Sequence, residues 1–238
     1  MLSKEEFQAH IDSGFNIIPV VENLPIENQT PLTLYSQVSK KNNTFLLESV
    51  EGGDRWSQYS IIGFNCSNTI KVTGNVVELK NSNKVTSITS DDPLGEIQKI
   101  TSSFKSPNVI DLPRFHGGYV GFFAYESARY AEKRISDLSS KESKFNKHMP
   151  EIFLVKAEQL VVYDNFNNSA QVIFNADPAK HSYDVVKERI NEMRACFSSS
   201  SNLEELKFKE PKGSMKFESN FKKEEYLDAV NTIKNYIK

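Results

Sequence analysis

Hydrophobic and polar positions follow two periods along this chain, and these periods predict short helices and short strands. Apolar residues three or four positions apart predict helices that begin at Ser3, Thr30, Asp92, Asp177 and Lys222. Short apolar runs bounded by glycine, asparagine or proline predict strands at Asn16–Val21, Phe45–Val50, Trp56–Phe64, Thr69–Val72, Val76–Leu79, Val85–Ile88, Gly117–Tyr125, Ile152–Tyr163 and Ala170–Phe174. Because local hairpins dominate, we expect an α+β fold in which antiparallel sheets pack together with peripheral helices.

Capping residues predict where several helices begin. Ser3 and Glu6 have the spacing of a capping box, and Thr30 precedes a proline at the first helical position. The pair Asp92-Pro93 opens another helix in the same way. The last predicted helix, Lys222–Lys238, carries an apolar stripe that consists of Tyr226, Ala229, Val230, Ile233 and Ile237.

Two strands have features that predict their place in a sheet. Pro19 lies within Asn16–Val21 and has no N–H to donate, so this segment is expected at a sheet edge. The long apolar segment Ile152–Tyr163 is expected to be one strand that forms a hairpin with Ala170–Phe174.

The stretch from Phe45 to Phe64 combines a predicted buried strand, a glycine turn and a second strand. Glu48 and Ser49 stand at the end of the first strand, where buried polar groups need partners or a ligand. A purely structural role is the alternative, in which Ser49 bonds a neighbouring strand and Glu48 pairs with a lysine or with Arg55.

Several motifs in order resemble anthranilate synthase component I, a family of chorismate-utilising enzymes. The similar segments are Thr30–Leu32 with Tyr35, LLES (Leu46–Ser49), VEGG (Val50–Gly53), RWSQYSIIG (Arg55–Gly63), GGYVGFFAYE (Gly117–Glu126) with Arg129 and Glu132, and the segments Tyr226–Val230 and Lys234–Lys238. The resemblance is to the N-terminal region of that family. It implies packed antiparallel sheets with an effector site.

The resemblance also implies a reaction for the complete enzyme. Such enzymes convert chorismate and ammonia to anthranilate and pyruvate with Mg²⁺, and a separate glutamine amidotransferase subunit supplies the ammonia. The residues that bind chorismate and Mg²⁺ lie in a later region of the family. We therefore expect this chain alone to be catalytically inactive and to contain no catalytic or metal-binding residue.

Four residues are candidates for an effector site. In the family that the chain resembles, the serine of LLES lies in the allosteric tryptophan pocket and the glutamate beside it shapes that pocket, which implicates Ser49 and Glu48. The glycines of Gly117–Gly121 leave room for a flat ring, so Tyr119 and Val120 are predicted as further contributors. A close-packed sheet explains the same glycines nearly as well. Tight binding of tryptophan is not expected from this chain alone.

Domain boundaries follow from composition and from the resemblance. We expect an effector-binding domain over residues 1–197, a serine-rich linker over 198–220, and over 221–238 the start of the helix that leads into the catalytic region.

Composition excludes several classes of function. The formal net charge is −2, from 29 basic and 31 acidic residues, which disfavours binding to nucleic acids or anionic membranes. No secretory signal or apolar segment long enough to span a bilayer is evident, so a cytoplasmic location is expected. Cys66 and Cys196 have no spacing typical of a disulfide framework or zinc site, and the four histidines are scattered.

Three alternatives remain open from the sequence. Aminodeoxychorismate synthase component I has the same architecture, although VEGG followed by RW after LLES favours anthranilate synthase. A stand-alone amino-acid-binding module and an inert truncated product are the other two. Tryptophan binding, binding of an amidotransferase and assay of the full-length gene product distinguish them.

Overall fold

The computed structural model describes residues 1–48, 58–108, 112, 115–132, 149–197, 219 and 221–237. The chain divides into two compact units, Met1–Ser201 and Asn202–Lys238. Ser49, the glycine turn that follows it, Trp56 and nearly all of the predicted linker lie outside the described residues.

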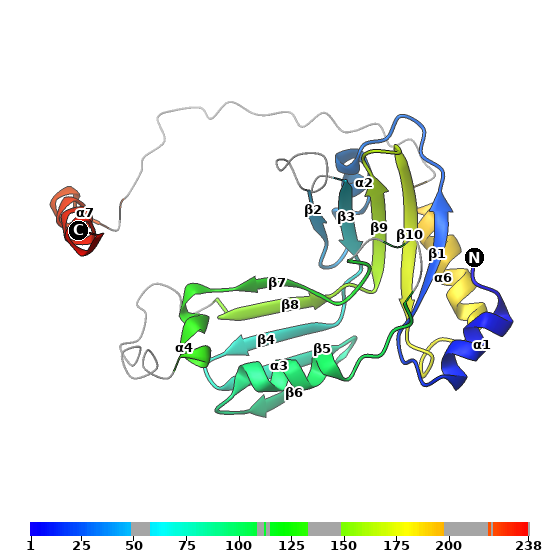
Figure 1. Ribbon diagram of the computed structural model, residues 1–238, viewed down its shortest axis with the longest axis horizontal. Coiled ribbons are helices and arrows are strands. Elements are labelled where there is room, and N and C mark those ends of the chain that lie inside the picture. Colours follow the sequence, from blue (N-terminus) through cyan, green and yellow to red (C-terminus); the bar gives the residue numbers. More distant parts are fainter. Residues whose placement is uncertain are drawn as a thin grey trace. The chain divides into compact units, whose positions relative to one another are not determined.

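The first unit is an α+β structure with antiparallel sheets, as predicted (Figure 1). Its helices are α1 (Lys4–Asp12), α2 (Pro31–Val38), α3 (Pro93–Ser102), the 3-10 helix η1 (Tyr125–Ser127), α4 (Ala128–Ala131) and α6 (Tyr183–Ala195). Its strands are β1 (Ile18–Leu24), β2 (Phe45–Leu47), β3 (Tyr59–Phe64), β4 (Thr69–Thr73), β5 (Val76–Asn81), β6 (Lys84–Thr89), β7 (Tyr119–Phe123), β8 (Ile152–Lys156), β9 (Gln159–Asp164) and β10 (Ser169–Ala176).

These strands form two sheets within the described ranges. Sheet A has the order β1-β10-β9-β3-β2, and sheet B has the order β6-β5-β4-β8-β7. Every pair of neighbouring strands is antiparallel. The chain passes from sheet A to sheet B after β3 and returns between β8 and β9. The strands of sheet B are therefore inserted in the sequence between two groups of sheet A strands.

The predicted caps of the first three helices are confirmed. Ser3 and Glu6 form a reciprocal capping box, Thr30 caps α2 ahead of Pro31, and the Asp92 side chain accepts a hydrogen bond from the backbone of α3. The predicted start of the fourth helix at Asp177 is wrong. Residues 177–180 form a turn instead, and α6 begins after Ser182, whose hydroxyl caps it.

The strand predictions need two corrections, while Pro19 does lie in an edge strand, β1. The segment that begins at Phe45 is not a buried central strand: β2 lies at the other edge of sheet A, and Leu47 is 43% exposed. The apolar segment Ile152–Tyr163 is two strands, because the chain bends at Ala157 and moves from sheet B to sheet A.

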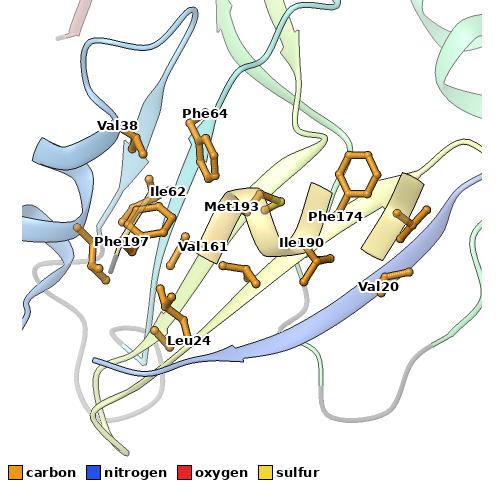
Figure 2. Packing of buried hydrophobic residues seen from close by; sticks show 14 of the residues in the cluster. Val20, Leu24, Val38, Ile62, Phe64, Val161, Phe174, Ile190, Met193 and Phe197 are labelled. Atoms are coloured by element: carbon orange, nitrogen blue, oxygen red, sulfur yellow. The ribbon is translucent and has the colours of Figure 1, made fainter. Parts of the chain in front are cut away.

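The main hydrophobic core lies between one face of sheet A and helices α1, α2 and α6. Figure 2 shows side chains of this core from the strands of sheet A together with Val38 of α2 and with Ile190 and Met193 of α6. Alternate residues of the strands point into this core, where they meet apolar side chains that repeat at helical spacing. Its fully buried members include Val20, Leu34, Val38, Ile62, Phe64, Val161, Val172, Ile190 and Phe197. Since this face contacts three helices, sheet A is the better covered of the two sheets.

Sheet B has a smaller core beneath helix α3, and Tyr130 of α4 packs against the same residues. Helix α3 covers one face and contributes Ile97, which packs with Ile70, Val72, Val77, Ile152 and Leu154 of the strands. Tyr119 of β7 packs against the same cluster. This arrangement brings β7, β8 and α3 together near the junction with sheet A.

The second unit contains helix α7 (Lys223–Ile237), in agreement with the helix predicted there. None of its described residues is buried, and the predicted apolar stripe is exposed at Tyr226, Val230, Ile233 and Ile237.

Candidate functional site

Buried polar side chains gather where sheet A and sheet B meet. Asn175, near the end of β10, is 3% exposed and donates from Nδ2 to the carbonyl oxygens of His116 (2.8 Å) and Ala157 (3.1 Å). The Ala157 backbone N–H in turn donates to the Gly118 carbonyl over 2.8 Å. A Cβ at Gly117 would lie 2.7 Å from Asn175 Nδ2, so any side chain there would displace the Asn175 amide. Asn175 therefore connects both sheets with the segment that precedes β7.

A charged pair lies next to this junction. Lys156, the last residue of β8, is 8% exposed, and its Nζ lies 3.1 Å from Glu158 Oε1. Asn68 donates to the other carboxylate oxygen of Glu158 over 2.8 Å. The Lys156 ammonium also lies 4.7 Å from the centre of the Phe104 ring, a cation–π contact. The buried charges thus have the opposite charge and hydrogen bonds that burial requires.

A cavity of about 500 Å³ opens beside this pair. Helix α3 and the residues after it, the segment before β7, and strands β7 and β8 supply most of its wall. Its principal side chains are Ile97, Phe104, Tyr119, Phe123, Leu154 and Lys156. Gly118 also lines it, with a φ of +116° that side-chain-bearing residues rarely adopt. A second cavity of about 290 Å³ shares Phe104, Tyr119 and Lys156 with the first.

Tyr119 is the polar aromatic residue of the larger cavity. Its ring centre lies 6.2 Å from that of Phe104, with an angle of 32° between the rings. Burial, and secondly the charge of Glu158, raise the pKa of the Tyr119 hydroxyl to about 12. The hydroxyl is therefore a protonated hydrogen-bond donor at neutral pH.

Cys66, at the same junction, is not poised for nucleophilic chemistry. The residue is fully buried, and its thiol contacts the Phe64 carbonyl at 3.7 Å. Burial, together with the Glu158 charge, raises the pKa of the thiol to about 12. The reactive thiolate is thus disfavoured at neutral pH.

The predicted site residues occupy different places in the described structure. Tyr119 faces α3 and the cavity, whereas Val120 follows it on the strand and points to the opposite face of sheet B. Glu48 is exposed just after β2 of sheet A, and Ser49 lies outside the described residues. A ligand on one face of sheet B would contact the side chain of only one of Tyr119 and Val120.

The glycines between Gly117 and Gly121 have separate explanations. A Cβ at Gly121 would lie 1.9 Å from the Phe153 carbonyl oxygen, so close strand pairing requires this glycine. Gly117 is required by Asn175, and Gly118 by its positive φ. The close-packed-sheet interpretation thus holds for Gly121, while Gly118 borders open space.

Sequence reasoning missed the residues that surround the cavity, above all Lys156, Glu158 and Asn175. A signal for two of them was present, because Lys156 and Glu158 are the charged positions inside an otherwise apolar run. Both lie where that run changes sheets, and a chain crossing can bury a charge only beside its partner.

The described ranges contain neither a candidate metal cluster nor a candidate membrane span. Within them, no group of three or more His, Cys, Asp or Glu side chains is placed to hold a metal ion. No helix in those ranges has both the length and the hydropathy needed to cross a bilayer.

Most of the chain matches the sequence model of a known protein family. The sequence model of the chorismate binding enzyme family matches residues 42–238. The chain belongs to this family. The match includes all strands from β2 onward, and hence β7 and β8 beside the cavity.

This chorismate binding enzyme family member is similar to curated proteins named anthranilate synthase component 1. It is 34% identical over 240 residues to the protein of Neisseria meningitidis serogroup B (strain ATCC BAA-335 / MC58). This alignment covers 100% of this chain and 48% of the relative. It is 32% identical over 244 residues to that of Pseudomonas aeruginosa, which covers 99% and 48%. The chain spans about half the length of the curated relatives that it matches.

A solved structure is also similar to this family member. It is anthranilate synthase component I from Streptococcus pneumoniae TIGR4, with a TM-score of 0.49 and 20% sequence identity. The similarity covers 75% of this chain and 37% of that one.

Proposed function

We propose that this chain is the N-terminal, tryptophan-binding part of an anthranilate synthase component I. The observation that carries the proposal is the 34% identity, over the whole chain, to a relative of that name of which it covers 48%. The order of the motifs LLES, VEGG and GGYVGFFAYE supports the assignment to the N-terminal region.

The complete enzyme would convert chorismate and glutamine-derived ammonia to anthranilate and pyruvate, and an amidotransferase, component II, would release the ammonia. Mg²⁺ would support the reaction, and we assign it to no residue of this chain. Residues 1–197 would form the effector domain, 198–220 a linker, and 221–238 the start of a helix that continues into the catalytic region. The chain alone would then be inactive.

The effector site is proposed at Ser49 and Glu48, with Tyr119 and Val120 as further contributors. Because Tyr119 and Val120 point to opposite faces of sheet B, at most one of their side chains would contact tryptophan, and the other would contribute through the backbone. Tryptophan offers an ammonium, a carboxylate and an indole, so its site needs an acceptor, a donor and an apolar slot. The exposed Glu48 carboxylate can accept from the ammonium, and Ser49 can donate to the carboxylate. Tryptophan would inhibit by binding one arrangement of this region against the catalytic region more tightly than the other.

The test uses the full-length gene product with its amidotransferase. Anthranilate formation from chorismate is followed by fluorescence while tryptophan is titrated. Ser49→Phe should raise the half-inhibitory tryptophan concentration at least about tenfold, equivalent to about 1.4 kcal/mol of binding free energy. Ser87→Phe is the matched control, because Ser87 is an exposed residue of β6 at the edge of sheet B, and it should leave inhibition unchanged.

Two results would refute the proposal. Unchanged tryptophan inhibition in Ser49→Phe would remove Ser49 from the effector site. Formation of aminodeoxychorismate in place of anthranilate would assign the chain to the folate-pathway relative.

A further inference from the structure

We propose that the cavity between α3 and strands β7 and β8 binds a small aromatic carboxylate. This cavity is the 500 Å³ space lined by Phe104, Tyr119 and Lys156. Glu48 is not among its lining residues, so the cavity is distinct from the Glu48 part of the effector site proposed above, although Tyr119 is named for both.

The size and the wall of the cavity suit a small organic ligand. Binding pockets commonly measure about 300–1,000 Å³ and are mainly apolar with a few polar groups. Here Ile97, Phe123 and Leu154 supply apolar surface, and no Asp or Glu is among the described lining residues.

Two aromatic rings favour a flat ligand. Phe104 and Tyr119 have ring centres 6.2 Å apart and are tilted by 32°. Gly118 lies at the edge of the same space, and among the described residues a Phe115 ring carbon, at 3.8 Å, is the one atom within 4 Å of a Cβ placed there. An aromatic ring can therefore approach the backbone at Gly118 and lie in edge or offset contact with one of the two rings.

The polar groups of the cavity favour a negative charge on that ligand. Lys156 lines the cavity, whereas its ion-pair partner Glu158 lines neither of the two cavities. The second carboxylate oxygen of Glu158 accepts a hydrogen bond from Asn68. An ammonium has three donors, and Glu158 accepts from only one of them at 3.1 Å. The protonated Tyr119 hydroxyl is a second donor, and Tyr119 is the register partner of Lys156 across the β7–β8 pair. A carboxylate can accept from both.

Two other polar side chains of the cavity wall, Thr101 and Asn175, already donate to backbone carbonyls. The Thr101 hydroxyl donates to the carbonyls of Ile97 and Gln98, each at 3.1 Å, within α3. The Asn175 amide is occupied by the carbonyls of His116 and Ala157. Lys156 supplies the positive charge that would select a carboxylate over a neutral group, and the Tyr119 hydroxyl is a donor on the neighbouring strand.

The experiment compares two probes that share a ring. Ligand-observed NMR titrations of the 238-residue chain use indole-3-acetate and its alcohol counterpart, indole-3-ethanol. We expect the acid to bind at least about tenfold more tightly than the alcohol, because only the acid can pair with the Lys156 ammonium. Equal affinity of the two probes, or no binding of either below about 10 mM, would overturn the proposal.

Variants identify the groups responsible. Lys156→Met alone would leave the Glu158 carboxylate without its cation, so it is combined with Glu158→Gln. The double variant should weaken the acid about tenfold and leave the alcohol unchanged. Lys99→Met, at an exposed lysine of α3, is the matched control and should change neither.

A milder variant keeps the test decisive if the double variant fails to fold. Tyr119→Phe retains the ring and removes only the hydroxyl, so it should weaken the acid at least about threefold and spare the alcohol. The proposal is refuted if indole-3-acetate binds Tyr119→Phe and a folded double variant as tightly as it binds the wild type. None of these results depends on tryptophan inhibition, so the Ser49 proposal succeeds or fails separately.

Discussion

Gly121→Ala is expected to separate β7 from β8 and thereby open the wall of the cavity. A Cβ at Gly121 would lie 1.9 Å from the Phe153 carbonyl oxygen and 2.9 Å from the Leu154 Cα. Both atoms are backbone of the neighbouring strand, so no side chain can rotate to make room. Ordinary contact begins near 3.4 Å, which means that the strands must move apart locally by roughly 1.5 Å.

The cost of this movement can be estimated from the topology. Among the described strands, β7 lies at the edge of sheet B and pairs with β8 alone, so it can shift outward without disturbing another of these strands. Overpacking costs about 1–3 kcal/mol, and each weakened strand hydrogen bond adds about 1 kcal/mol. We therefore expect Gly121→Ala to lower the free energy of unfolding by about 3 kcal/mol.

Urea unfolding followed by circular dichroism measures this difference. Gly74→Ala is the control, because no atom of the described part of the chain lies within 4 Å of a Cβ there, and its φ of +57° is unfavourable by about 1 kcal/mol. Hydrogen exchange should show lost protection in β7 of Gly121→Ala, and the carboxylate probe should bind less well through Tyr119. The reasoning is refuted if Gly121→Ala lies within about 0.5 kcal/mol of the wild type, or costs no more than Gly74→Ala.

Three further tests concern the core packing, a half-buried histidine and a helix cap. Phe197→Ala removes a ring that packs edge-on against Phe64, with 5.6 Å between the ring centres, and it should lower the free energy of unfolding in urea by about 3–5 kcal/mol. A decrease of less than about 1 kcal/mol would contradict the buried position of Phe197 in this core. Burial lowers the pKa of His181, whose Nδ1 accepts from the Asp177 backbone N–H at 3.2 Å. The folded state therefore binds a proton at His181 less readily than the unfolded chain does. For this reason the contribution of His181 to stability should be present above pH 6.5 and should be lost as the pH falls. An NMR titration that gives His181 a pKa of 6.5 or higher would disprove this prediction. Asp92→Ala removes the cap of α3 and should lower stability by about 1 kcal/mol, whereas no change would show that the cap is dispensable.

The sequence by itself determined the local elements of this protein. Ser3 with Glu6, Thr30 and Asp92 cap the helices predicted to follow them, because a cap satisfies backbone donors only a few residues away. Pro19 indicated an edge strand for the same local reason, since proline has no N–H to donate. Family membership was also readable in short motifs, although no contact of the described residues tests the predicted roles of Glu48 and Ser49.

Only the tertiary structure decided how these elements meet. The apolar run Ile152–Tyr163 gives the same pattern whether it is one strand or two, and the bend at Ala157 depends on bonds to Gly118 and Asn175, which are distant in sequence. Likewise, apolar character alone did not show that β2 lies at an edge of sheet A. The charge of Lys156 was visible in the sequence, but its burial beside Glu158 and an aromatic cavity results from long-range packing. Periodicity shows which face of a helix or strand is apolar. Which other element packs against that face depends on contacts between residues distant in sequence, and no local pattern contains this information.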